Sequence, residues 1–320
     1  MVSSRVYERF LNEIRKNLPP NVNLATLLSD MLFIEKEAVY RRLRGEVAFT
    51  FNEIITIARE MTISLDSIIG IEGYKSRPLQ LKLPDFIYPK KEDMIMFETF
   101  FLFLEQIVSS GDTEAATMCN TLPQDIFPKF DVLMRYIIFK WQYFYHSNKA
   151  LPFHEMIVPG FITEGLKKQC LICRQIKNTS FIFDNQLCRY IVDDVHYFKS
   201  IRMIRDDDVI RIKEELFRMI DYLENMTIRG VFEETGNSVN IYVSDVDITT
   251  TYSYIRSGGI MFSLIKTFFL TSATSTDERI YEMIRNWIAT GLKLSTLITE
   301  TNERQRVVYF EKQRQLADAL

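Results

Sequence analysis

The sequence predicts a mainly α protein of two domains: a small domain of five short helices, and a larger, mostly helical α+β domain with a small C-terminal sheet. Apolar residues recur at spacings of three and four along most of the 320 residues, as in amphipathic helices. A stretch with three prolines and no sustained period interrupts them. After Gly230 the pattern changes to the alternation typical of strands. The expected division is a first domain over residues 1–72, a linker over 73–92, and a second domain over 93–320, helical over 93–229 and α+β over 230–320.

Composition narrows the class of protein. Hydrophobic residues make up 47% of the chain, enough for ordered, well-packed cores. The net charge is −3, so any surface that binds nucleic acid must be a local basic patch. The N-terminal residues lack the apolar run of a signal peptide, and the richest apolar run, 94–104, is shorter than the ~20 residues a membrane span needs. With four cysteines as well, we expect a cytoplasmic protein without a membrane segment or disulfides.

The five helices of the first domain are predicted from apolar spacing and from residues that start or stop helices. Asparagine and threonine accept hydrogen bonds from free N–H groups at a helix start, while glycine ends a helix in the left-handed conformation. The expected helices cover residues 4–18, 24–32, 36–44, 51–61 and 64–70. The expected stop and capping residues are Pro19, Pro20, Asn23, Gly45, Thr50 and Ser64.

The second domain is predicted in the same way. Helices are expected over residues 94–108, 130–145, 159–176, 209–223, 275–292 and from 304 onward. The acidic run 206–208 lies at the start of the fourth of these, where carboxylates complement the helix dipole. Ser275 and Glu278 have the spacing of a capping box. Strands are expected within residues 236–245, after a Gly-Asn turn signal, and over residues 264–272 and 295–299.

The first domain resembles a phage-repressor-like, Cro-type helix-turn-helix domain over residues 4–70. The positions that carry the resemblance are Leu28, Ser29, Ile34, Val39, Leu43, Gly45 and the closing SLDSIIG. More closely, FIEKEAVYRRLRGEVAFTFNEI followed by ISLD resembles a Bacteroidetes family of transcriptional regulators, in which a Cro-like domain precedes a large domain of unknown function. The likeness extends through LPQDIFPKF, FKWQYFY, IYVSD and TLITETNERQR, and so spans most of the chain. It implies a five-helix Cro-like helix-turn-helix domain that binds DNA.

Helix geometry divides the side chains of the expected recognition helix, residues 36–44. At 100° per residue Val39 and Leu43 face inward, while Tyr40, Arg41 and Arg44 face outward. Early residues of such a helix contact base edges, so the expected readout residues are Lys36, Glu37, Tyr40 and Arg41. Arg41 suits guanine, and Glu37 suits the cytosine amine.

Other residues of this region are expected to bind phosphate or to serve the fold. Arg44, near the helix end, and the Thr50 hydroxyl are expected to contact phosphate. Arg42 lies on the inner side, where we expect it to pair with Asp30, Glu46 or Glu53.

Together these observations predict a sequence-specific, DNA-binding transcriptional regulator that works as a homodimer on double-stranded DNA, because one small helix-turn-helix makes few contacts. The alternative is a protein-interaction or scaffold module that keeps the fold without binding DNA. Phe33 replaces the usual turn glycine, and Glu35 and Glu37 place carboxylates where phosphate would approach. The large domain is expected to supply the dimer contacts.

An effector, small molecule or protein, is a further expected partner. The aromatic cluster of residues 139–145 is interpreted mainly as core or interface, and also as the place for an effector pocket. Its members are Phe139, Trp141, Tyr143, Phe144 and Tyr145.

Catalytic and metal chemistry find little support. Cys170 and Cys173 form a CxxC pair that Cys188 and His196 would complete as a zinc site, but the spacing also describes buried thiols on one helix face, which we favour. An enzyme would need a polar pocket near Asp193, Asp194 and His196. GxSxG and HExxH motifs are missing from the sequence. We therefore expect no enzyme activity, cofactor or metal.

Overall fold

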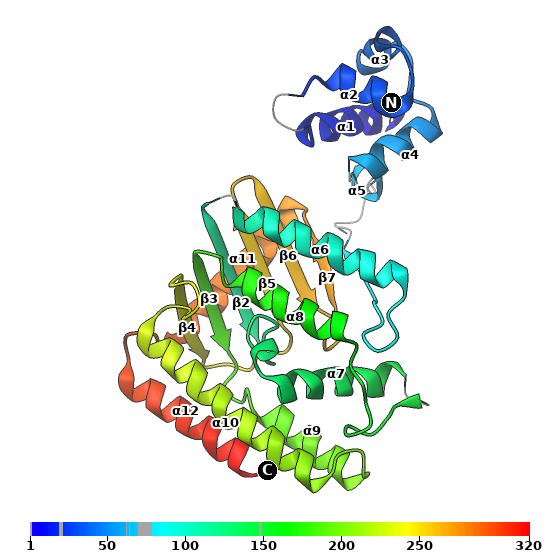
Figure 1. Ribbon diagram of the computed structural model, residues 1–320. Helices are drawn as coiled ribbons and strands as arrows, with labels where there is room; N and C mark the ends of the chain where they lie inside the picture. The colour runs from blue at the N-terminus through cyan, green and yellow to red at the C-terminus, as the bar shows by residue number, and fades with distance from the viewer. Residues whose placement is uncertain are drawn as a thin grey trace. The chain divides into compact units, whose positions relative to one another are not determined.

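The computed structural model describes residues 2–18, 22–61, 63, 65–69, 79–109, 111–146 and 149–320. The chain forms two compact units, Met1–Pro78 and Leu79–Leu320, which are described separately (Figure 1). The expected helix stop at Pro19 and Pro20, the expected cap Ser64, and residues 73–78 of the expected linker lie outside the described residues.

The first unit has five helices among its described residues: α1 (Val2–Lys16), α2 (Leu24–Leu32), α3 (Lys36–Leu43), α4 (Phe51–Glu60) and α5 (Leu65–Ile69). Two expected caps are confirmed. The Asn23 side chain accepts from the Thr26 N–H at 3.1 Å, and Thr50 forms a capping box with Glu53. The apolar faces of the helices meet in one core, whose fully buried members include Ile14, Leu28, Val39 and Ile57.

The second unit corrects the predicted fold class. The described residues form one mixed sheet of eight strands, in the order β1-β7-β6-β5-β2-β3-β4-β8, instead of a small C-terminal sheet. Two of its central strands lie within residues 93–229, which were expected to be helical. The strands are β1 (Gln80–Leu81), β2 (Thr113–Cys119), β3 (Asn178–Phe183), β4 (Ser238–Ser244), β5 (Tyr252–Ser257), β6 (Ile260–Lys266), β7 (Ser272–Ser275) and β8 (Ser295–Leu297).

At β2 the sheet changes from antiparallel to parallel pairing, and on the parallel side β8 is added to β4 as an antiparallel edge strand. On one side β2 pairs in parallel with β3, and β3 pairs in parallel with β4. On the other side β2 pairs antiparallel with β5, which continues through β6 and β7 as a meander. The predicted strand 264–272 is correct for residues 264–266, which end β6, and for Ser272, which begins β7, but wrong for residues 267–271, which form the turn between these strands.

Helices cover both faces of this sheet (Figure 1). One face packs against α6 (Lys91–Ser109) and α8 (Gly160–Cys173), through Phe101, Leu104 and Ile172. The other face packs against α11 (Glu278–Lys293), through Ile280, Ile284 and Ile288. Helix α11 begins at Asp277, whose carboxylate accepts from the N–H groups of Arg279 and Ile280. The expected capping role of Ser275 is therefore wrong, because Ser275 is the last residue of β7.

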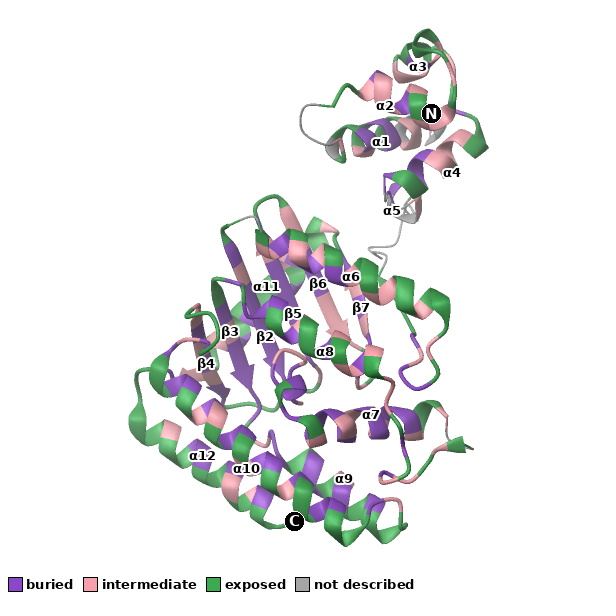
Figure 2. Ribbon diagram, viewed as in Figure 1, coloured by how far each residue is buried: buried purple, intermediate pink, exposed green. Residues whose placement is uncertain are grey.

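The remaining helices enclose the largest core, drawn mostly in purple in Figure 2. These are the short 3₁₀ helix η1 (Phe127–Lys129), α7 (Asp131–Tyr145), α9 (Arg189–Ser200), α10 (Asp206–Arg229) and α12 (Glu303–Asp318). Helix α10 ends at Gly230, whose φ of +66° is costly for residues with a side chain. A Cβ there would also lie 2.9 Å from the Glu300 side chain.

Candidate functional site

The turn between α2 and α3 is held by a side-chain hydrogen bond and by buried apolar residues. The Ser29 hydroxyl donates to the Ile34 carbonyl at 2.6 Å. Leu28 of α2 and Val39 of α3 are fully buried in the same core. Phe33, in the turn, adopts the left-handed conformation at φ 55° and ψ 41° with its side chain 93% exposed. These contacts fix the direction in which α3 presents its outer face.

The predicted DNA-contacting residues all have exposed side chains. They are Lys36, Glu37, Tyr40, Arg41, Arg44 and Thr50. Lys36, Glu37, Tyr40 and Arg41 belong to α3, Arg44 is the residue that caps the end of α3, and Thr50 is the residue that caps α4. The Thr50 hydroxyl oxygen accepts from the Glu53 N–H at 3.3 Å. Because a hydroxyl can accept and donate at once, this cap leaves the Thr50 proton for a phosphate oxygen.

The exposed arginines of α3 have acidic neighbours. Arg44 contacts Glu46 at 2.7 Å and Glu37 at 3.3 Å, and Arg41 lies 3.6 Å from Glu46. Exposed pairs of this kind contribute ~0–1 kcal/mol, so a nucleic-acid phosphate can replace the carboxylate at small cost. The hydrogen bond that Arg44 donates to Glu46 raises the pKa of Arg44 further, so its guanidinium stays charged. Sequence analysis did not identify Glu46 as a partner of either arginine.

Arg42 differs from its neighbours because it pairs inside the unit. Its Nε and Nη2 donate to the two carboxylate oxygens of Glu53 at 3.0 and 2.9 Å, and its Nη1 donates to the Ala38 carbonyl at 3.1 Å. Burial would raise the pKa of Glu53, but the Arg42 hydrogen bonds and the Thr50 N–H lower it below its usual value. The predicted structural role of Arg42, with Glu53 as its partner, is confirmed.

A second candidate site is a pocket of about 540 Å³ in the second unit, which we call the Lys266 pocket. It lies beyond the carboxyl end of β2, the end of the parallel strands at which open α/β sheets bind ligands. Three of the predicted aromatic residues line it, whereas Phe139 and Tyr143 pack against Phe198 instead. The lining residues are Leu83, Pro84, Asn120, Thr121, Trp141, Phe144, Tyr145, Thr250, Thr251, Lys266, Thr267, Phe268, Phe269 and Thr271.

Lys266 is the cationic side chain of this pocket. Its Nζ donates to the Thr121 hydroxyl at 3.0 Å. Burial lowers the pKa of Lys266 to about 8, since removing water disfavours the charged ammonium. The buried Cys119 thiol of β2 opposes this shift, and the positive charge of Lys140 on α7 adds to it. The sequence does not single out Lys266, because nothing in LIKTFFLTS shows that its lysine is half-buried.

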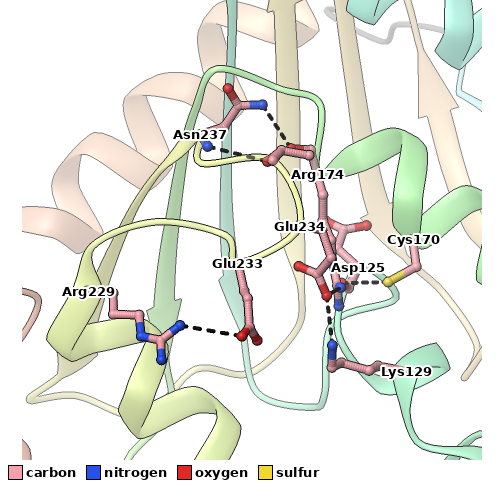
Figure 3. A network of polar contacts seen from close by, with 9 residues as sticks. Asp125, Lys129, Cys170, Arg174, Arg229, Glu233, Glu234 and Asn237 are labelled. Atoms are coloured by element: carbon pink, nitrogen blue, oxygen red, sulfur yellow. Dashed lines mark hydrogen bonds and ion pairs between the residues drawn. The ribbon is translucent and has the colours of Figure 1, made fainter.

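A buried polar network lies at the opposite, amino-terminal ends of β3 and β4 (Figure 3). Arg174, 2% exposed, forms an ion pair with Glu234, which also accepts from Lys129 at 2.7 Å. The Arg174 carbonyl accepts from the Asn237 side chain at 3.0 Å. Burial would raise the pKa of Glu234, but the Lys129 hydrogen bond and the Arg174 charge lower it. The network ties the segments before β3 and β4 together through Glu234, which Arg174 and Lys129 share, while the buried Nε and Nη2 of Arg174 have no hydrogen-bond partner among the described residues.

The cysteines are buried thiols. Burial raises the pKa of Cys170 and of Cys188 to about 12, and that of Cys173 well above its usual value, so each stays protonated at neutral pH. The Cys170 thiol donates to the Asp125 carbonyl at 3.0 Å. Within the described part of the chain, no three His, Cys, Asp or Glu side chains are grouped to hold a metal ion.

The acidic residues beside His196 have separate partners. Asp194 forms an ion pair with Lys140, while Asp193 is exposed. His196 lies 3.0 Å from the Ala319 carbonyl at the end of α12. None of these three residues lines the Lys266 pocket.

No helix within the described ranges has the length and apolar character to cross a membrane. Comparisons with models of protein families, with curated proteins and with solved structures found no match to this chain.

Proposed function

We propose that this chain is a sequence-specific, DNA-binding transcriptional regulator that acts in the cytoplasm as a homodimer. The supporting observation is how the arginines of α3 and of its C-terminal cap differ in their partners. Arg42 is held by Glu53 inside the unit, whereas Arg41 and Arg44 are exposed beside Tyr40. An outer face with two exposed guanidinium groups, whose carboxylate partners are themselves exposed, suits the major groove, where Arg41 can donate to guanine O6 and N7.

The test is selection from a random duplex library at near-physiological salt, with wild type, Arg41→Ala and Arg59→Ala compared. Arg59 is the matched control, an exposed arginine of α4 that is paired with Glu60. Wild type and Arg59→Ala should recover one palindromic site. Arg41→Ala should lose ~1–3 kcal/mol of base discrimination at one position of each half-site. If folded wild type enriches no sequence, or Arg41→Ala keeps the full preference, the proposal fails.

Arg44 should act differently, since it is proposed to contact phosphate. Arg44→Ala should weaken binding to all sequences and reduce the slope of log affinity against log salt by ~1. Equal, sequence-independent losses for Arg41→Ala and Arg44→Ala would contradict the assigned roles.

A second candidate function is a protein-interaction module. The observation that favours it is the acidic neighbours of the α3 arginines, Glu37 and Glu46, together with two large exposed aromatic side chains, Phe33 and Phe51. A Phe33→Ser, Phe51→Ser double variant should leave DNA selection unchanged under the first function and abolish partner capture under the second.

A further inference from the structure

The Lys266 pocket combines one cation with mostly apolar walls. Aromatic rings of Trp141, Phe144 and Tyr145 from the end of α7 face Phe268 and Phe269 from the turn between β6 and β7. Its volume of about 540 Å³ lies in the range of ligand sites, ~300–1,000 Å³. The pocket therefore suits a molecule with an apolar body and one polar end.

The lysine has no acidic partner in the pocket. The lining residues include no Asp or Glu. Of the charged groups that act on Lys266, Lys140 is another cation, whose ion pair is with Asp194. A partly buried ammonium without a carboxylate partner is costly, and an anionic ligand would offset that cost.

The hydroxyl groups around Lys266 indicate which kind of anion the pocket can bind. Thr121 accepts from Lys266, so its own proton remains for a ligand oxygen. The other threonine hydroxyls of the pocket bond elsewhere: Thr250 donates to the Lys266 carbonyl and Thr251 to Asn120, while those of Thr267 and Thr271 bond to each other, and that of Thr267 also to the Thr271 carbonyl. One ammonium and one hydroxyl match the two oxygens of a carboxylate. The second charge of a phosphate monoester would be buried unpaired, at a cost of several kcal/mol.

We propose that the Lys266 pocket binds a small molecule with a single carboxylate and an apolar body. The carboxylate contacts the Lys266 ammonium and the Thr121 hydroxyl, and the body packs among the aromatic rings. This proposal does not depend on DNA binding, so the two can be tested separately.

A tryptophan in the pocket allows ligand binding to be measured by fluorescence. Trp141 lines the pocket, and the second of the two tryptophans, Trp287, is 59% exposed on α11. In a full-length Trp287→Phe background, fluorescence therefore reports on Trp141 alone. The probes are octanoate and 4-phenylbutyrate, each beside the neutral alcohol of the same skeleton.

Each acid should change Trp141 fluorescence with saturation, and at least one should bind about 30-fold or more tightly than its alcohol. Lys266→Met keeps the length of the stem and removes the charge. It should reduce the affinity for the acids about 30-fold or more and change that for the alcohols little. Lys293→Met, at an exposed lysine of α11, is the matched control and should bind as wild type does.

Phe144→Ala tests whether the ligand binds in the Lys266 pocket without changing Lys266 itself. Phe144 is 65% exposed, so its removal should leave the unit folded, as circular dichroism will check. It should weaken both the acid and the alcohol several-fold, because it removes part of the apolar wall. If Lys266→Met does not fold, the proposal is tested by Phe144→Ala and by the preference of wild type for the acid over the alcohol.

Three results would overturn the proposal: no saturable response to either acid, equal affinity for acid and alcohol in wild type, or undiminished acid binding by folded Lys266→Met.

Discussion

Phe33 adopts backbone angles that glycine adopts at little cost. Its φ of 55° brings Cβ close to the following carbonyl, which costs ~1–2 kcal/mol. Its side chain is 93% exposed and so gains little from packing. Phe33→Gly should therefore raise the free energy of unfolding of the first unit by about 0.5–1 kcal/mol, after glycine's greater freedom in the unfolded chain is subtracted. Hydrogen exchange of α2 and α3 in the full chain measures this.

The matched control is Phe33→Leu, which removes the ring and keeps Cβ. It should leave exchange rates unchanged. If both variants slow exchange equally, the ring and not the backbone angle carries the cost.

Arg41 and Arg42 are adjacent in sequence, but their substitution by alanine should change the stability of the first unit by different amounts. Arg42→Ala leaves the Glu53 carboxylate, 14% exposed, without its guanidinium, and should destabilise the first unit by about 2 kcal/mol, between the values for exposed and buried pairs. Arg41→Ala should change stability by less than ~0.5 kcal/mol. The same exchange measurement distinguishes them, and equal effects would contradict the structural role of Arg42.

Helix α3 lacks a side-chain cap. Glu35 has the extended backbone of an N-cap residue, but its carboxylate makes no capping hydrogen bond. Glu35→Ser should supply one and stabilise α3 by ~1 kcal/mol, read as slower hydrogen exchange. Glu35→Ala removes the same charge without supplying a cap, so it should give no such gain. A gain shared by both variants would assign the effect to charge.

Elements were predictable where one face is buried and the other exposed. The five N-terminal helices and α6, α7, α8 and α10 follow from that spacing. Strands β2 and β3 do not follow from it, because the last five side chains of β2 are all buried, and so are the last three side chains of β3. A strand covered on both faces shows no alternation, and the Ala and Thr residues of TEAATMC add only a weak strand preference.

The partners of individual side chains depend on the whole fold. The inward position of Arg42 follows from helix geometry alone, which left Asp30, Glu46 and Glu53 as possible partners, and the fold selects Glu53. The Lys266 pocket does not, because its walls come from segments as far apart in sequence as Leu83, Thr121, Trp141, Thr250 and Lys266. Only the sheet order, with β2 beside β5, brings these segments together.

The burial of Lys266 should make the stability of the second unit depend on pH. Its pKa in the folded chain, about 8, is below its usual 10.5, so the unfolded chain binds the proton more tightly. The cost of burying the charge is present below pH 8 and disappears as the pH rises from about 8 to about 10.5. Relative to Lys266→Met, wild type should therefore gain stability over this range, by at most about 3 kcal/mol.

Thermal unfolding of both chains at about pH 7 and about pH 10 measures the effect. The difference in Tm between them, and not either Tm alone, carries the information, because the other titrating groups are common to both. These include Cys119 and Lys140, the groups that act on Lys266 from β2 and α7. The exposed Lys293→Met should show a difference from wild type that does not vary with pH. A constant difference for Lys266→Met as well would mean that Lys266 keeps its usual pKa, and that water reaches its ammonium in the folded unit.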